Sequence, residues 1–353
     1  MDPSTASFAA AGPGSVIGFE AFVAALASDA TNLSVLATDP AQSSPLVIVD
    51  LREWEDSSAH SVQIAAGQLP ACPVIGVAAG GADQALPNFV DAVVERDADL
   101  ASIQKIVAKC PHAATVFVQL LRHNEGLSVA QGLFAESLAY STLQHGAEFS
   151  AWLTQRQNTS NESSVAKEDP AEPAVRVSRE FDRLHITLNR PQRKNAFSTE
   201  MRDLLCEALE LALADGSIKE IQLSAAGTAF CAGGDLQEFG EARDAAVAHL
   251  SRTTRSAGAL LHRLSSRVSV RVQGACIGAG IELPAFAGQI RAHPDSFFVL
   301  PEVGLGLVPG AGGCSSLLRR IGRQRTAFMG LSGARIDAQQ ALTWGLIDDI
   351  AAS

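Results

Sequence analysis

The chain of 353 residues has no long run of consecutive lysine or arginine residues, and its formal net charge is −11. Nucleic acids and anionic membranes both attract basic surface patches, so this acidic balance argues against either as a partner. Gly, Pro, Asp or Arg interrupts every apolar stretch well before about 20 residues, the length that a membrane-spanning helix needs. The N-terminus also lacks a basic segment followed by an apolar core, so we expect no secretion signal.

The six cysteines show no CxxC spacing and have no companion histidines at the spacing of metal ligands. This pattern predicts free, buried thiols in a reducing cytosol and no metal site. Cys231 and Cys276 lie within two glycine-rich segments that we discuss below. Their neighbours are small and apolar, which favours a packing role over a nucleophilic one.

The first part of the chain predicts a few strands followed by helices. Compact apolar runs at 45–51 and 72–78 are typical of buried strands, and the run at 16–26 suggests a short helix. From residue 100 onward, apolar residues recur at helical spacing. They predict two helices between 100 and 121, separated at Pro111, and further helices at 128–143 and 147–156.

Residues 157–173 are nearly devoid of apolar side chains, which predicts a polar linker between a first module, 1–156, and a second module, 174–353. In the second module we expect strands at 184–188, 221–224, 268–272 and 296–299. Helices are predicted from Ser198 or Thr199 to Gly216 and from Leu236 to about Arg263. Strands that alternate with helices indicate an α/β fold with a largely parallel sheet.

Two glycine-rich segments each follow an apolar strand, at 229–236 (AFCAGGDL) and 274–283 (GACIGAGIEL). Glycine lets the backbone approach a ligand closely, and the start of a helix presents unpaired N–H groups. Two such loops can direct two amides at one developing negative oxygen, which is an oxyanion hole. Glu282 in the second segment and Glu302 in the segment 301–313 (PEVGLGLVPGAGG) are candidates for acid and base.

Each of these features also has a simpler interpretation. Both loops could be tight strand-to-helix turns. Glu282 could be a structural charge in the first turn of a helix, where the dipole favours a carboxylate. Glu302 could be an ordinary solvated charge at the end of a strand.

The segments 188–197 (LNRPQRKNAF), 229–236, 274–283 and 301–313 resemble, in order and spacing, the fingerprints of the crotonase superfamily, the enoyl-CoA hydratase/isomerase family. The resemblance covers most of 174–350 and implies a crotonase-like spiral of ββα repeats with surrounding helices. It implies oxyanion-hole amides at Gly234 and Ala279. It also implies that Glu282 activates water and Glu302 delivers a proton, so that a 2-enoyl-CoA thioester is hydrated to a 3-hydroxyacyl-CoA.

The same resemblance implies an acyl-CoA substrate and no other cofactor, since coenzyme A enters as part of the substrate. Family members also form homo-oligomers, trimers or hexamers. The substrate-binding residues that it implies are Arg193, Lys194, Ala196, Ala232, Asp235, Leu236, Trp152 and Arg156. For Arg193 and Arg156, a solvated surface charge stays an alternative.

Crotonase-like chains continue past the segment matching 344–350 into helices that complete the substrate pocket. Here the segment 132–156 resembles that helical tail. We therefore expect the first module to be a smaller, degenerate crotonase-like α/β unit that ends in helices and supplies the tail. An unrelated accessory domain is the alternative.

Two classes of function remain open. The first is an enzyme, either a hydratase or a protein with another crotonase activity, namely an isomerase, a thioester hydrolase or a lyase, because these reactions use the same oxyanion hole. The second is a non-catalytic acyl-CoA-binding protein. The presence of both Glu282 and Glu302 favours the hydratase, since a binding protein does not need both carboxyls.

Overall fold

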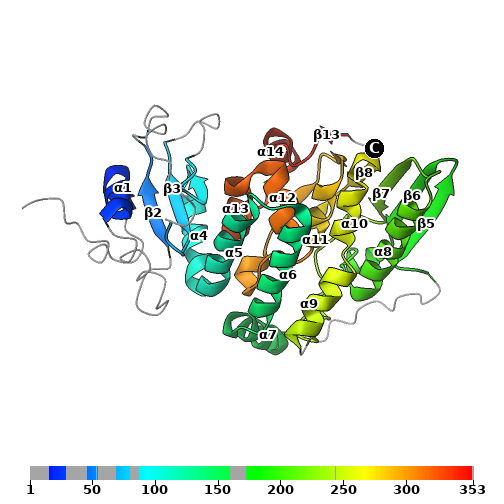
Figure 1. Ribbon diagram of the computed structural model, residues 1–353, viewed down its shortest axis with the longest axis horizontal. Coiled ribbons are helices and arrows are strands. Elements are labelled where there is room, and N and C mark those ends of the chain that lie inside the picture. The colour runs from blue at the N-terminus through cyan, green and yellow to red at the C-terminus, as the bar shows by residue number, and fades with distance from the viewer. Residues whose placement is uncertain are drawn as a thin grey trace, which may run out of the picture.

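A four-stranded parallel sheet forms the N-terminal end of the computed structural model, which describes residues 16–28, 46–52, 54, 69–79, 87–159, 172–242 and 244–351 (Figure 1). The strands lie in the order β1 (Val16–Gly18), β2 (Val47–Asp50), β3 (Val74–Val77) and β4 (Ala92–Val94). β2 and β3 confirm the two predicted strands. The run at 16–26, predicted as a helix alone, begins as β1 because Val16 pairs with Ile48, and α1 (Phe19–Ser28) follows.

Four helices follow this sheet and confirm the four helical patterns. They are α4 (Asp97–Lys109), α5 (Pro111–Asn124), α6 (Val129–Gln144) and α7 (Ala147–Thr159). Pro111 is the first residue of α5, where the missing N–H costs no helical hydrogen bond. Ser128 caps α6 in a capping box with Gln131. α7 runs past Arg156 into the predicted linker, whose residues 160–171 lie outside the described ranges, and the division into modules stays a prediction.

The second half of the chain is an α/β unit built from repeated strand–strand–helix turns. Its strands are β5 (Val175–Glu180), β6 (Arg183–Leu188), β7 (Glu220–Ala225), β8 (Val268–Val272), β9 (Ala275–Ile277), β10 (Gln289–Ala292), β11 (Phe297–Val299), β12 (Ile336–Asp337) and β13 (Asp349–Ile350). Its α-helices are α8 (Thr199–Ala214), α9 (Ala245–Thr254), α10 (Ala257–Arg263), α11 (Ala279–Glu282), α12 (Gly313–Ile321), α13 (Arg323–Ser332) and α14 (Ala338–Trp344).

Two sheets organise these turns. One has six strands in the order β13-β10-β8-β7-β6-β5, and the other has three in the order β12-β11-β9. All neighbours in the first sheet are parallel except β5 and β6, which confirms the predicted largely parallel sheet. In the pairs β8–β9 and β10–β11, the first strand joins the large sheet and the second joins the small one. The short helix α11, which follows β9, is buried along its whole length.

The predicted helix from Leu236 to Arg263 is wrong. Residues 236–242 form turns, and two shorter helices, α9 and α10, follow. Gly240 has φ +90°, which is incompatible with a right-handed helix, and the Asp244 carboxylate caps α9 instead. Ser256 caps α10, so the chain ends one helix and starts another at Arg255. The break leaves the turn 236–242 free to lie beside α7.

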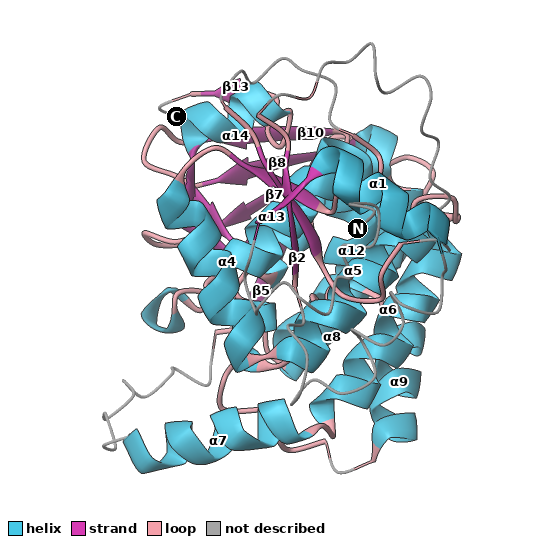
Figure 2. Ribbon diagram, turned by 90° about the vertical axis from the view of Figure 1, so that its left-hand side faces the viewer, coloured by secondary structure: helices cyan, strands magenta, loops and turns pink. Residues whose placement is uncertain are grey.

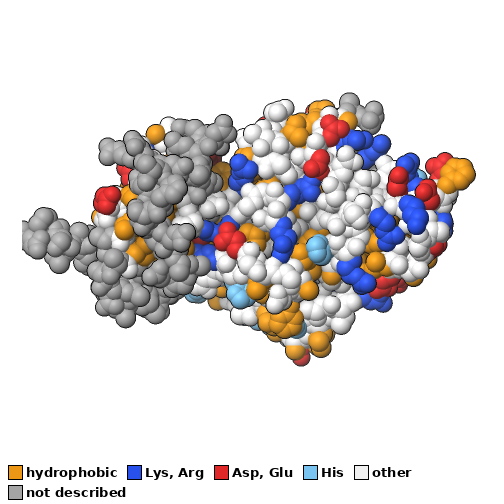
Figure 3. All heavy atoms as spheres, turned by 45° about the horizontal axis from the view of Figure 1, so that its top comes forward, with side chains coloured by type: hydrophobic (Ala, Val, Ile, Leu, Met, Phe, Trp, Pro, Cys, Tyr) orange, Lys and Arg blue, Asp and Glu red, His pale blue; other side chains and the backbone are white. Residues whose placement is uncertain are grey.

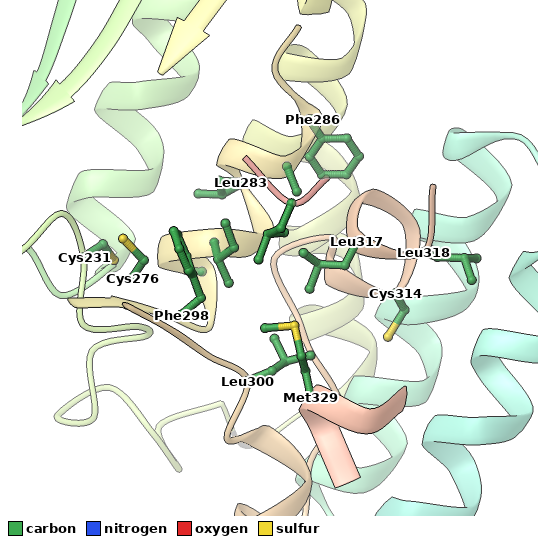
Figure 4. Close-up of a cluster of buried hydrophobic side chains, with 14 of the residues drawn as sticks. Cys231, Cys276, Leu283, Phe286, Phe298, Leu300, Cys314, Leu317, Leu318 and Met329 are labelled. Carbon is green, nitrogen blue, oxygen red and sulfur yellow. The ribbon is translucent and has the colours of Figure 1, made fainter. Parts of the chain in front are cut away.

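The helices α4 and α5 lie between the N-terminal sheet and the second half of the chain, α6 packs against α12 and α9 of the second half, and α7 lies at the lower edge in both ribbon views (Figures 1 and 2). Their side chains pack on glycines of the second half. The Phe117 ring lies on Gly330, the Tyr140 ring lies on Gly310, and Leu153 lies on Gly240. The helices and the second half therefore share one hydrophobic core. Part of that core, between α11 and α12, is drawn in Figure 4.

Buried charges also join the two halves. The Arg323 guanidinium donates to Asp91 and to the backbone carbonyls of Asn88 and Val90. Arg122 from α5 binds the same Asp91 carboxylate. Removing one member of such a buried ion pair leaves the other charge buried without a partner, which is destabilising. The cluster therefore holds α13 in place against β4 and α5.

The surface carries mixed charges. On the face in Figure 3, acidic and basic side chains alternate and form no large patch of one sign. Among the helices that the structure describes, none is both long and apolar enough to cross a membrane. All six cysteines are unpaired and buried, as predicted.

Candidate active site

Two glycine-rich loops, 231–235 and 276–280, lie side by side. Cys231 and Cys276 form a parallel bridge, and the Ile277 N–H donates to the Cys231 carbonyl at 3.0 Å. A Cβ at Gly280 would collide with that carbonyl, so only glycine permits the approach. Gly278 has φ +51°, and a Cβ there would overlap Glu302 Oε1. These two glycines therefore bring the loops together and let Glu302 approach them.

Each loop carries one backbone amide that makes no hydrogen bond with any described residue, at Gly234 and at Ala279. Neighbouring amides are paired: Asp235 N–H donates to the Phe197 carbonyl, and Glu282 N–H donates to the Gly278 carbonyl. Ala279 is the first residue of α11, where an N–H has no partner within the helix. The loop geometry thus leaves two amides available for an acceptor outside the described residues.

Glu282 is a buried carboxylate at the end of α11, with 2% of its surface exposed. Its Oε2 accepts hydrogen bonds from the Ala311 N–H at 2.8 Å and from the Gly313 N–H at 2.9 Å. Gly313 starts α12, so the carboxylate lies at the positive end of that helix. Both interactions favour the ionised form of Glu282.

Glu302 approaches the same point from another element. It is the first residue of a short 3-10 helix, Glu302–Leu305, that follows β11. Its Oε2 is buried and has no hydrogen-bond partner in the described part of the chain. A Cβ added to Gly278 would overlap Glu302 Oε1 and would lie 3.8 Å from Glu282 Oε1. The two carboxyl groups therefore flank the Gly278 backbone.

The two carboxyls differ in their affinity for a proton. Burial raises the pKa of Glu282 to about 7, and the amides of Ala311 and Gly313 oppose that rise. Burial raises the pKa of Glu302 well above its usual range, and the negative charge of Glu282 adds to the rise. The pair titrates as one unit, in which Glu282 ionises first and Glu302 holds its proton.

A third buried glutamate, Glu136 of α6, was not identified in the sequence. It accepts hydrogen bonds from Gly312 N–H at 2.7 Å and from Cys314 N–H at 2.8 Å. The signal in the sequence is a glutamate in the middle of a helix that is otherwise poor in charge, but its partners lie 176 residues or more away along the chain. Although three glutamates meet here, the described residues contain no group arranged to hold a metal ion.

Tyr140 lies one helical turn beyond Glu136 and close to the same cluster. Burial raises the pKa of Tyr140 to about 12, the nearby Arg252 opposes the rise, and the charges of Glu302 and Glu282 add to it. The Arg252 guanidinium lies over the Tyr140 ring, 4.1 Å from its centre. The tyrosine thus remains a neutral phenol beside the two carboxyls.

Cys231 and Cys276 lie together on the apolar side of the loops (Figure 4). Burial raises the pKa of the Cys231 thiol to about 12, and it raises that of Cys276 well above its usual range. Both side chains are therefore protonated thiols, in keeping with a packing role.

The structure gathers most of the predicted coenzyme A residues around the first loop. Arg193 forms an ion pair with the buried Asp235 at 2.6 Å, so Arg193 is not a freely solvated charge. The Lys194 carbonyl accepts from the Ala232 N–H at 2.9 Å. Ala196 lies in the same turn, which leads to the bridge between Phe197 and Gly234. The segment 193–197 is thereby fixed against 232–235.

Trp152 and Arg156 reach this loop from α7. The Arg156 guanidinium donates to the Leu236 carbonyl at 2.7 Å and lies 5.9 Å from the centre of the Trp152 ring. Trp152 stacks on Phe149 at 5.7 Å between centres and contacts Phe239 edge to face at 5.9 Å. The segments that carry the predicted substrate-binding residues on either side of the linker therefore meet within one chain.

Comparison with known proteins identifies relatives of the second half of the chain. Residues 183–353 match the family model described as enoyl-CoA hydratase/isomerase. The chain is 38% identical over 174 residues to the 2,3-dehydroadipyl-CoA hydratase of Escherichia coli, 35% over 175 residues to the mevalonyl-coenzyme A hydratase of Beauveria bassiana, and 35% over 167 residues to the 1,2-epoxyphenylacetyl-CoA isomerase of Escherichia coli.

These alignments cover 49, 47 and 46% of this chain. The chain spans 68, 62 and 63% of the length of the three relatives. A crystal structure of an enoyl-CoA hydratase from Mycobacterium smegmatis aligns with 51% of this chain and 71% of its own, at 32% identity and a TM-score of 0.48.

Proposed function

Because the chain belongs to the enoyl-CoA hydratase/isomerase family, we propose that it adds water to a 2-enoyl-CoA thioester and forms the 3-hydroxyacyl-CoA. One observation carries the proposal. Two buried carboxyls, Glu282 and Glu302, flank Gly278, and only Glu282 is held by two backbone amides. A base and an acid at one point are what hydration requires, because one group must take a proton and the other must give one.

In the proposed reaction, Glu282 takes a proton from a water molecule as the water oxygen bonds to C3. The electron pair of the C2–C3 double bond moves toward the thioester carbonyl, whose oxygen becomes negative. The amides of Gly234 and Ala279 stabilise that oxygen. The Glu302 proton then passes to C2, and Glu282 is left protonated and Glu302 ionised until proton exchange restores them.

Coenzyme A serves as the handle in this proposal. Arg156 and Trp152 on α7 and the segments 193–196 and 232–236 would bind its adenine and phosphates. The addition of water is redox-neutral, so the reaction calls on no electron carrier. Assembly into a trimer or hexamer is part of the proposal, and sedimentation analysis tests it.

The direct test of the proposal is a panel of 2-enoyl-CoA thioesters that differ in their acyl groups. Hydration removes the conjugated double bond, so the enoyl absorbance should fall with time for at least one thioester. Conversion to a 3-enoyl isomer also removes conjugation, so the products should be separated and the hydroxyacyl-CoA identified by mass. A panel in which every thioester is bound but none is converted would favour the non-catalytic alternative.

The rate should depend on pH through both glutamates. Since burial raises the pKa of Glu282 to about 7, kcat/KM should rise as the pH passes through neutrality and Glu282 becomes the ionised base. It should fall again at the higher pH at which Glu302 loses its proton. The measurement is kcat/KM from acid to alkaline pH, and a profile that is flat through neutrality would contradict the assignment of the base.

Ala279→Pro should remove one oxyanion-hole donor with little change in the loop. Ala279 is the first residue of α11, a position that tolerates proline. We expect the barrier to rise by roughly 3 kcal/mol, which lowers kcat more than a hundredfold. Ala279→Gly keeps the N–H and is the matched control, expected to retain most of the activity. A folded Ala279→Pro variant, verified by circular dichroism, with normal turnover would exclude this amide as a donor.

A further inference from the structure

The turn 311–314 is held by two glutamates that approach it from different parts of the chain. The amides alternate along the turn: those of Ala311 and Gly313 donate to Glu282, and those of Gly312 and Cys314 donate to Glu136. All four bonds measure between 2.7 and 2.9 Å. Two carboxyl groups thus share the N-terminal end of α12.

The turn cannot keep this shape by itself. Gly312 has φ +111°, a conformation that is strained for any other residue. Gly313 is packed tightly against Glu282, since a Cβ there would lie 2.8 Å from Glu282 Cγ. Without Glu136, the N–H groups of Gly312 and Cys314 would lack the acceptor that they now have. Buried unpaired amides cost free energy, so the turn would move to satisfy them.

Glu136 itself is rigidly placed. Only 2% of its surface is exposed, and it lies near the middle of α6, which packs on α12 and α9. On the same helix, Gly132 fits so closely that a Cβ would collide with Ser315 of α12. Next along α6, Ser137 makes a hydrogen bond of 2.9 Å with His249 of α9. The carboxyl group of Glu136 therefore holds the turn 311–314 in a fixed position.

We infer that Glu136 is a positioning residue for the proposed reaction, because it holds the turn 311–314 in the geometry that directs two amides at the base Glu282. The inference rests on the proposed function and extends it. It assigns a role at the reaction centre to α6, a helix from the first half of the chain. Glu136 and Gly312 lie 176 residues apart in the sequence.

The expected effect on Glu282 has a definite sign. The amides of Ala311 and Gly313 favour the ionised form of Glu282, so a loosened turn should raise its pKa. Burial and the charge of Glu282 raise the pKa of Glu136 well above its usual range, so Glu136 is a neutral carboxyl when Glu282 ionises and its removal takes away no negative neighbour. The other titratable groups facing this cluster, which stay unchanged in the variants, are Glu302, Tyr140, Cys231, Cys314 and Arg252.

The test compares Glu136→Ala and Glu136→Gln with the full-length protein. In Glu136→Ala, kcat/KM at neutral pH should fall about tenfold, and the acid limb of its pH profile should move to higher pH by roughly one unit, so that alkaline pH restores much of the rate. Glu136→Gln keeps one oxygen acceptor and should show a smaller change in the same direction. KM should change less than kcat in both variants.

Ser137→Ala is the matched control, since Ser137 is the buried neighbour of Glu136 and its side chain makes hydrogen bonds with His249 of α9. It should lower the melting temperature without moving the acid limb. An acid limb that stays in place in both Glu136 variants, or moves to lower pH, would overturn the inference. If Glu136→Ala does not fold, Glu136→Gln alone decides the question.

A second readout needs no substrate. The infrared band of the protonated Glu282 carboxyl, assigned as the band missing in Glu282→Gln, can be followed with pH in the free protein. Its midpoint should lie at higher pH in Glu136→Ala than in the unmodified chain, and an unchanged or lower midpoint would refute the positioning role. This result is independent of whether the protein hydrates a CoA thioester, so failure of the inference and failure of the proposed function are distinguishable.

Discussion

Glu302→Gln should lower the rate of hydration roughly a hundred- to ten-thousand-fold, because an amide cannot deliver a proton to C2. Glu282→Gln should cause a loss of similar size, since the amide cannot accept a proton from water. Both side chains keep their shape, so acyl-CoA binding should change little. The measurements are kcat from the loss of enoyl absorbance and the affinity for the 3-hydroxyacyl-CoA from calorimetry.

The two glutamates act on one transition state, which sets the expectation for the double variant. The double variant should be only slightly slower than the slower single variant, since removing either member already disables the unit. Glu148→Gln is a suitable control, because the Glu148 carboxylate also accepts from two amides, His112 N–H and Ala113 N–H, but caps α5. Glu148→Gln should therefore lower the stability of the protein and not the rate of hydration. Near-normal hydration by both single variants would show that the assignment is wrong.

Residues 174–353 alone should aggregate or bind CoA thioesters poorly. We propose that the first module covers the pocket of the second. The helices α5 and α6 pack on α12, and Phe117 and Tyr140 lie against Gly330 and Gly310. Without these helices the apolar surface of α12 and α13 would be exposed to water. The shortened chain would also lack Trp152 and Arg156, which contact the loop at 236–239.

The test uses residues 1–156 and 174–353 expressed separately and then mixed. Light scattering should detect association of the second module by itself, and addition of the first should restore solubility and some activity. The matched variant is Arg323→Ala in the full chain, which breaks the buried contacts with Asp91 and should weaken the same docking. A second module that is fully soluble and fully active without the first would contradict the covering role.

The sequence predicted elements that depend on local patterns. The strands β2, β3, β6, β7, β8 and β11 and the helices α4 to α8 follow from apolar periodicity, caps and proline, which act over a few residues. Seven strands were not predicted: β1, β4, β5, β9, β10, β12 and β13. β9 has only three residues, and β5 exposes most of its side chains, so neither carries a clear apolar signal. The helix predicted from Leu236 to Arg263 was wrong because a single glycine in the left-handed region outweighs its apolar spacing.

The residues of the candidate site also divide into those that a local pattern predicts and those that it does not. Glu282, Glu302 and the two free amides lie in short motifs that a sequence displays directly. Glu136 and the ion pair of Arg193 with Asp235 depend on which distant segments the fold brings together, and no local pattern encodes that choice. The buried Oε2 of Glu302 likewise becomes visible only when the surrounding loops are in place.

The central claim is that water adds across the double bond of an enoyl-CoA. The most direct measurement is to incubate the protein with a 2-enoyl-CoA in water enriched in oxygen-18 and to analyse the product by mass spectrometry. The account predicts a 3-hydroxyacyl-CoA that carries one heavy oxygen on C3, and loss of this product in Glu302→Gln. A product of unchanged mass with a shifted double bond, or no product although the thioester binds, would contradict it.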